Sequence, residues 1–284
     1  MGRRGIDYAL GRGAHETSRL IEQSRIYNGS TRRMLQEAGI SEGMRVLEIG
    51  SGAGDVALML AEMVGPEGHV VGVDMNASIL ETARARVREL GLLNVEFIAE
   101  DALALTAKRG VFDSPFDAVA GRFVLMYTPD PAETLARLAT HLKPGGIAAF
   151  QEPEYTLYKA LSSEGAPLMR QLIEWIVSAF ERSGAHLDAG LALLRAFVEA
   201  GFSPPSMRLE APIGAAKEWA GYQYMSTIFQ SLLPRLERYG VASARKVDAE
   251  TLAERLRAEV LSSKRPFFLP PHILAHAALK KQPA

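Results

Sequence analysis

The stretch Val46–Asp55, with the sequence VLEIGSGAGD, constrains the fold of this chain most strongly. It opens with a short apolar run, typical of a buried strand in a parallel sheet: Val46, Leu47 and Ile49. Three glycines follow at every second position: Gly50, Gly52 and Gly54. Because glycine has no Cβ, such a backbone can turn sharply and let a ligand approach closely. An amphipathic helix comes next, and together these elements predict a small-molecule site above a sheet.

The glycine spacing argues against a dinucleotide site. Such sites are typical of G-x-G-x-x-G, whereas this chain has E-x-G-x-G-x-G between Glu48 and Gly54. Two further apolar runs end in carboxylates, HVVGVD at Asp74 and VEFIAED at Asp101. Because the carboxyl ends of parallel strands lie at one edge of the sheet, we expect these acids and the glycine loop to surround one pocket.

In these features the chain resembles the class I S-adenosylmethionine (SAM) dependent methyltransferases, over about residues 40–155. The turn LKPGG at 142–146 is similar to that of the ubiquinone/menaquinone C-methyltransferase-like branch. The resemblance implies an α/β, Rossmann-like, doubly wound seven-stranded sheet that uses SAM and releases S-adenosylhomocysteine. It implies that Asp74 accepts both ribose hydroxyls and that Asp101 and Ala102 meet the adenine. The cofactor-binding residues it implies are Glu48, Gly50, Ser51, Gly52, Gly54, Asp74, Met75, Asp101, Ala102 and Arg122.

Composition narrows the class of protein. The net charge of −1 gives no electrostatic footprint for nucleic acid. The chain has no cysteine, so disulfides, thiolate metal sites and thiol capture of arsenite are excluded. No apolar run approaches membrane-spanning length, and the N-terminus has no signal-peptide core. We find no metal-ligand set, and we predict a cytoplasmic protein.

We expect one domain over residues 1–284. Its sheet core is predicted at about 40–155, 186–213 and 266–284, and a helical cap at 1–39, 155–185 and 214–265. Residues 14–38 predict two helices that break at Asn28-Gly29 and lie over the cofactor or on the sheet edge. In the first case, three arginines are candidates to meet the cofactor's carboxylate: Arg25, Arg32 and Arg33.

The predicted cap is rich in aromatic and thioether side chains. Such a surface suits either a lid over a hydrophobic or aromatic acceptor, or a core or dimer interface. We therefore predict a small-molecule acceptor and keep a homodimer as a possibility. The substrate-binding candidates are Tyr27, Tyr127, Trp175, Trp219, Tyr222 and Met225.

For methyl transfer from SAM, the protein mainly has to hold an acceptor in line with a methyl group that is already activated. A general base can assist, and the weak candidates are Glu152, Tyr222 and His15. We predict methyl transfer to O, N or C of a small hydrophobic or aromatic acceptor, such as a natural product or a quinone-like compound. The alternatives are a SAM-binding protein that catalyses a non-methyl reaction such as cyclisation, and a non-catalytic SAM-binding regulator.

Overall fold

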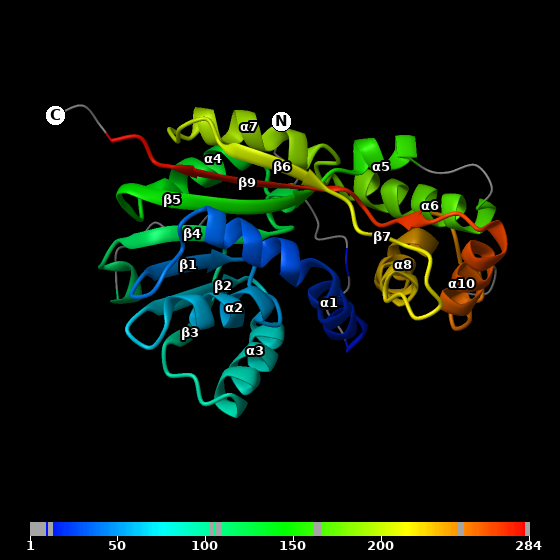
Figure 1. Cartoon of the computed structure of the whole chain (residues 1–284), viewed down its shortest axis with the longest axis horizontal. Helices are drawn as coiled ribbons and strands as arrows, with labels where there is room; N and C mark the ends of the chain where they lie inside the picture. Colours follow the sequence, from blue (N-terminus) through cyan, green and yellow to red (C-terminus); the bar gives the residue numbers. More distant parts are fainter. Residues whose placement is uncertain are drawn as a thin grey trace.

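The centre of the protein is a seven-stranded sheet with strand order β3-β2-β1-β4-β5-β9-β6. The structure, a computed structural model (Figure 1), describes residues 10, 14–102, 105, 110–161, 166–243 and 247–281. The strands are β1 (Arg45–Ile49), β2 (His69–Asp74), β3 (Val95–Ala99), β4 (Phe116–Arg122), β5 (Leu142–Pro153), β6 (Ser206–Glu210) and β9 (His272–Ala278). Strands β1 to β5 run parallel, and β9 runs antiparallel to its neighbours β5 and β6. The predicted α/β fold with seven strands is confirmed.

Helices cover both faces of the sheet, because successive side chains of a strand point to opposite faces. Val46 packs in one layer with α1 (Ala14–Glu37), α2 (Asp55–Val64) and α3 (Ala77–Glu89). Leu47 and Ile49 pack in the other with α4 (Pro131–Ala139) and α7 (Ala189–Glu199). The chain runs outward from β1 through β2 to β3, and then in the opposite direction from β4 to β5. Ligands of open parallel sheets bind at such a switch point, beyond the carboxyl ends of the strands.

A helical cap with its own hydrophobic core lies beside the sheet (Figure 1). It contains α5 (Tyr155–Leu161), α6 (Pro167–Ser183), α8 (Gly221–Arg238), α10 (Leu252–Ser263) and the short strands β7 (Ile213–Gly214) and β8 (Phe267–Phe268), which pair with each other. Helix α1 contacts both α8 and α2, so it joins the cap to the sheet. None of the described helices is both long and apolar enough to cross a membrane.

The predicted break at Asn28-Gly29 is wrong, because α1 is one helix of 24 residues. A Cβ on Gly29 would meet only Nη1 of Arg33, at the ordinary contact distance of 3.8 Å, so a side chain has room at this position of the helix. Burial of Tyr27 on one side and of Leu35 on the other holds the segment helical. Tertiary packing of this kind outweighs the low helix propensity of a single glycine.

Because α1 continues through Gly29, the effect of a substitution there on stability can be predicted. Gly29→Ala should stabilise the protein by about 0.5–1 kcal/mol, because alanine is the better helix former and its methyl group has room. Gly39→Ala is the matched control, and it should destabilise because Gly39 has φ 89. Urea unfolding measures both. Destabilisation by Gly29→Ala would show that the helix is broken there.

Candidate functional site

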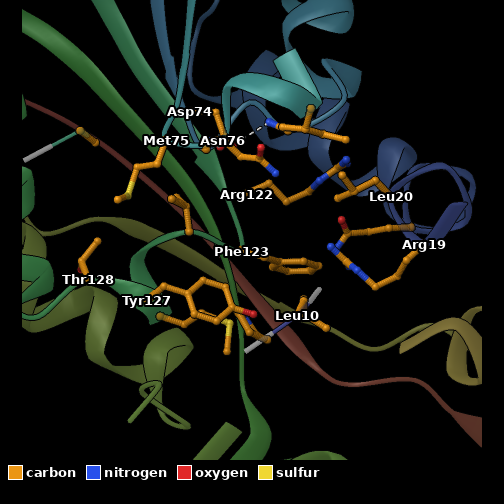
Figure 2. Close-up of a pocket in the computed structure, with 18 of the residues that line it drawn as sticks. Leu10, Arg19, Leu20, Asp74, Met75, Asn76, Arg122, Phe123, Tyr127 and Thr128 are labelled. Atoms are coloured by element: carbon orange, nitrogen blue, oxygen red, sulfur yellow. Dashed lines mark hydrogen bonds between the residues drawn. The ribbon is translucent and has the colours of Figure 1, made fainter. Parts of the chain in front are cut away.

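A cavity of about 430 Å³ lies at the carboxyl ends of the parallel strands, beneath α1 (Figure 2). One part, here called the glycine side, is lined by Gly50, Gly52, Asp74, Met75, Asp101 and Ala102. The other, the aromatic side, is lined by Phe123, Met126, Tyr127, Tyr155, Phe180, Tyr224 and Ile228. The volume is that of an ordinary small-molecule pocket.

The glycine loop needs its glycines for two separate reasons. Gly50, Gly52 and Gly54 have φ values of 70, 49 and 87, a region that other residues rarely adopt. A Cβ on Gly50 would lie 2.7 Å from Cγ2 of Val124, and one on Gly52 would lie 3.2 Å from Cδ1 of Leu20. The loop is therefore packed closely from two directions, by the turn after β4 and by α1.

Asp74 joins the loops that follow β1 and β2. Its Oδ2 accepts the N–H of Gly52 at 2.9 Å, and its Oδ1 accepts the N–H of Asn76 at 2.8 Å. Since Asp74 lines the cavity, its oxygens are suited to accept hydrogen bonds from ligand hydroxyls there.

The structure brings most of the proposed cofactor residues to the cavity, but not all. Met75, Asp101, Ala102 and Arg122 line it together with Gly50, Gly52 and Asp74. Three others lie outside the lining: Glu48, Ser51 and Gly54. Ser51 is buried, and Gly54 begins helix α2 as its N-cap.

Glu48 is a buried acid beneath the loop, only 2 % exposed. Burial raises its pKa to about 8, although a hydrogen bond from Ser51 and the charge of Arg122 act in the opposite direction. Its Oε2 has no hydrogen-bond partner in the part of the chain that the structure describes. At neutral pH the carboxyl group is therefore mostly protonated, and it supports the loop from below.

Two guanidinium groups face the cavity next to the glycine loop, and one of them was not predicted. Arg122, the last residue of β4, donates to Oδ1 of Asn28 at 2.8 Å and to Oγ1 of Thr31 at 3.2 Å. Arg19 lies in α1, the helix that also carries Asn28 and Thr31, and lines the cavity (Figure 2). It is only 3 % exposed. Paired cationic donors of this kind suit a carboxylate ligand.

The three arginines considered as carboxylate ligands lie elsewhere. Each forms a surface ion pair, Arg25 with Glu22, Arg32 with Glu62 and Arg33 with Glu210. Because α1 is one continuous helix, the side chain of Arg19 faces the cavity, whereas the side chains of these three arginines face the protein surface. Their charge alone does not separate them, because all four arginines lie in the same helical segment.

Glu152, a candidate base, lies under the turn that follows β4. It is fully buried and accepts the N–H groups of Val124, Leu125 and Met126 at 3.0, 2.8 and 3.2 Å. Burial raises its pKa to about 7, and the three backbone bonds limit that rise. It does not line the cavity, so its position is that of a support for the turn.

Of the other candidate bases, Tyr222 is buried in the cap against Trp219, with ring centroids 5.3 Å apart. His15 lies in α1, but its side chain is outside the described residues. Among the described lining residues of the aromatic side, none is a carboxylate or a histidine.

Among the proposed substrate residues, Tyr127 lines the cavity and the others lie in the cap core. The residues outside the lining are Tyr27, Trp175, Trp219, Tyr222 and Met225. Trp175, for example, packs on Phe229 with ring centroids 5.6 Å apart. The aromatic surface we expected to cover an acceptor is thus largely the packing of the cap.

The lining of the cavity instead includes Tyr224 and Ile228 of α8. These two are four positions apart and share one helix face, while Met225 and Phe229 share the next. Both pairs belong to the cap core, but Met225 and Phe229 do not line the cavity. Helical periodicity could have separated the two faces, although it could not have said which one faces the cavity.

Glu48 predicts a pH dependence of stability. Since its pKa in the folded protein exceeds that of an unfolded chain, native stability should fall as the pH rises from about 4.5 to about 8. Glu48→Gln cannot ionise, so relative to wild type it should gain on the order of 1–4 kcal/mol between pH 5 and pH 8. Urea unfolding at both pH values measures this, with exposed Glu89→Gln as control. Parallel stability curves for wild type and Glu48→Gln would contradict it.

Comparison with known proteins gives a family match. Residues 40–193, more than half of the chain, match the family model described as a methyltransferase domain. The ubiquinone/menaquinone biosynthesis C-methyltransferase UbiE of Pseudomonas savastanoi is 36 % identical over 147 residues, 49 % of this chain and 56 % of that one. The demethylmenaquinone methyltransferase of Listeria welshimeri is 38 % identical over 110 residues, 39 % and 45 % of the two chains. The chain thus spans about half the length of these curated relatives.

Solved structures share the fold at low identity. YcgJ of Bacillus subtilis aligns with a TM-score of 0.58 at 18 % identity, over 90 % of this chain and all of that one. The [4+2]-cyclase SpnF aligns with a TM-score of 0.53 at 16 % identity, over 99 % and 100 %. These structures show the shared fold. The family match, together with the glycine loop and the sheet order, identifies the chain as a member of the class I SAM-dependent methyltransferases.

Proposed function

We propose that this chain transfers the methyl group of SAM to an O, N or C atom of a small hydrophobic or aromatic molecule. One observation carries the proposal: the glycine loop, Asp74 and two arginines line a cavity that continues into an aromatic side. In this proposal the sheet holds the cofactor, the cap completes the acceptor site, and residues 1–284 act as one domain.

The residues of the glycine side match the chemical groups of SAM. In this proposal Asp74 accepts hydrogen bonds from the ribose hydroxyls, and Asp101 and Ala102 contact the adenine. Their position in the cavity lining supports these roles. Arg19 and Arg122 offer cationic donors to the methionine carboxylate, and the glycine loop leaves its backbone open to close approach. In this proposal the cavity therefore has partners for the adenosine of SAM, for its carboxylate and for its apolar chain.

The aromatic side supports an acceptor recognised mainly by shape. SAM supplies an already activated methyl group when it is bound. The protein then has to orient the acceptor and exclude water, and Phe123, Met126 and Phe180 provide apolar contact for this. Among the described residues that line the aromatic side, none is a carboxylate or a histidine, which favours catalysis by positioning over proton removal by a protein base.

A second candidate is a non-methyl reaction such as cyclisation. It is favoured by the lack of a carboxylate or histidine among the described residues of the aromatic side, and the similarity in fold to a [4+2]-cyclase extends over nearly the whole chain. The mass of the product separates the two reactions, because methyl transfer adds one methyl group and releases S-adenosylhomocysteine. Binding of SAM without turnover of any acceptor would favour the regulator instead.

Cofactor binding tests the proposal directly. SAM and S-adenosylhomocysteine should bind and NAD should not, as measured by calorimetry. Asp74→Ala should weaken S-adenosylhomocysteine by at least about tenfold, because bonds to a charged acceptor are worth about 1.5–3 kcal/mol each. The exposed Asp113→Ala is the control and should change nothing. Binding of NAD without SAM would refute the proposal.

The glycine loop gives a second test. Gly52→Val should abolish cofactor binding and leave circular dichroism close to wild type. Valine disfavours φ 49, and its Cβ would lie 3.2 Å from Leu20, so the loop would shift where the ligand must approach. Gly91→Val, at another positive-φ glycine with open space around it, controls for strain alone. Wild-type affinity of Gly52→Val would show that the loop does not approach the ligand.

A further inference from the structure

An apolar patch, here called the α7–β6 patch, lies on the surface where α7 meets the last strand of the sheet. Leu191, Leu194 and Val198 of α7 are between 42 and 53 % exposed, and their spacing of three and four positions puts them on one helix face. Met207 and Leu209 of β6 are exposed as well. Contiguous apolar surface of this kind marks an interaction site, whereas single exposed apolar residues do not.

The register of the sheet places both elements of the patch on one face. Met207 pairs with Ala275 of β9, and Leu209 pairs with Ile273. Residues directly opposite each other point to the same face, and both β9 residues pack in the layer that contains α7. A Cβ on Gly190, at the start of α7, would lie 3.2 Å from Cβ of Ile273. Helix α7 thus covers β9, while β6 keeps its apolar side chains exposed on that same face.

The other face of β6 is charged. Arg208 donates to Oε1 of Glu37 at 2.8 Å, and Oε2 of Glu210 accepts from Arg33 at 2.8 Å. Both partners belong to α1, which lies on the opposite side of the sheet from α7 (Figure 1). Arg208 and Glu210 therefore share one face, two positions apart, and Leu209 between them points to the other.

Strand β6 has an open edge, because it ends the strand order and pairs only with β9 among the described strands. Such an edge offers backbone N–H and C=O groups to a further strand. A second β6 that runs antiparallel, with a two-fold axis at Leu209, places Arg208 of each copy opposite Glu210 of the other. An axis at Arg208 would instead bring two arginines together. The charges of β6 are thus complementary to those of a second β6 in the first register.

We propose that two copies of this chain pair through the edges of their β6 strands and form a symmetric dimer with one continuous sheet. The two α7–β6 patches then lie side by side, because a two-fold axis perpendicular to the sheet keeps both on the same face. Pairing supplies the edge with hydrogen bonds and removes apolar surface from water in one step. The aromatic residues of the cap, which the sequence also made candidates for a dimer interface, pack in the cap core. The inference is independent of the proposed function.

The mass of the whole chain in solution tests the dimer. Sedimentation equilibrium between about 1 and 100 µM should give a mass that rises from 30.9 kDa toward twice that value. Leu209→Arg should raise the dissociation constant of the dimer about tenfold or more, because it puts two like charges at the axis and removes apolar contact. Leu93→Arg is the matched control, since Leu93 is 97 % exposed and lies outside the patch. A wild type that stays at 30.9 kDa would overturn the inference.

Charge reversal tests the register. Arg208→Glu faces Glu210 of the other copy with a like charge, and Glu210→Arg does the same to Arg208, so each variant alone should dimerise about tenfold or more weakly. An equimolar mixture of the two variants should recover the wild-type affinity to within about threefold, because both opposing pairs then have opposite signs. The ion pairs with α1 are lost in the separate variants and in the mixture alike, so they do not account for a recovery.

Two further outcomes decide against the proposal. If the wild type is a dimer but the mixture stays monomeric, the copies meet in another register or at another surface. If the wild type is monomeric and binds an added extended peptide at β6, the edge serves a different partner. Circular dichroism of each variant checks the fold, and Leu209→Arg keeps the test valid if a charge variant folds poorly.

Discussion

Two loops meet at the switch point of the sheet with no space for a side chain between them. A Cβ on Gly50, after β1, would lie 2.7 Å from Val124, after β4. Glu152 holds the second loop in place, because it accepts the N–H of Val124 and those of the next two residues. The glycine side and the aromatic side of the cavity begin at these two loops. Their relative position therefore depends on the contact of Gly50 with the side chain of Val124 and on one buried carboxyl group.

Helix α1 is the other structural requirement of the site, because it covers the cavity and connects the cap to the sheet. Thr31 donates to Oε1 of Gln151 at 2.6 Å, and Arg122 donates to Asn28 and Thr31, so the helix is tied to β4 and β5 by a buried polar network. Unpaired, these groups would be costly to bury, and their pairing therefore defines how α1 sits. The same helix places Leu20 over the glycine loop.

The features that were predictable from sequence are local ones. The glycine loop and the acids at the ends of β2 and β3 follow from an apolar run and the residues directly after it, so the sheet and most of the glycine side were predicted. The aromatic side depends on which face of a helix meets the cavity, and both faces of α8 are apolar. Tyr222 and Tyr224 are both buried, but Tyr224 packs on Tyr27 of α1 whereas Tyr222 packs on Trp219, and this long-range packing is not visible in the sequence. Packing likewise overrode the break expected at Gly29.

Phe123 shows how the two sides are combined in one residue. It is a non-glycine residue with φ 54, a conformation that costs on the order of 1 kcal/mol or more and persists only when its surroundings impose it. Its N–H bonds to the carbonyl of Gln151 at 2.8 Å, and its ring is held by Tyr27 and by His272. Burial lowers the pKa of His272 to about 4, so this neighbour is neutral and adds no charge. A glycine in place of Phe123 would remove the backbone strain, but it would leave an empty space between the two arginines and the aromatic side. The strain is thus consistent with a ring that must stand where the two halves of the cavity meet.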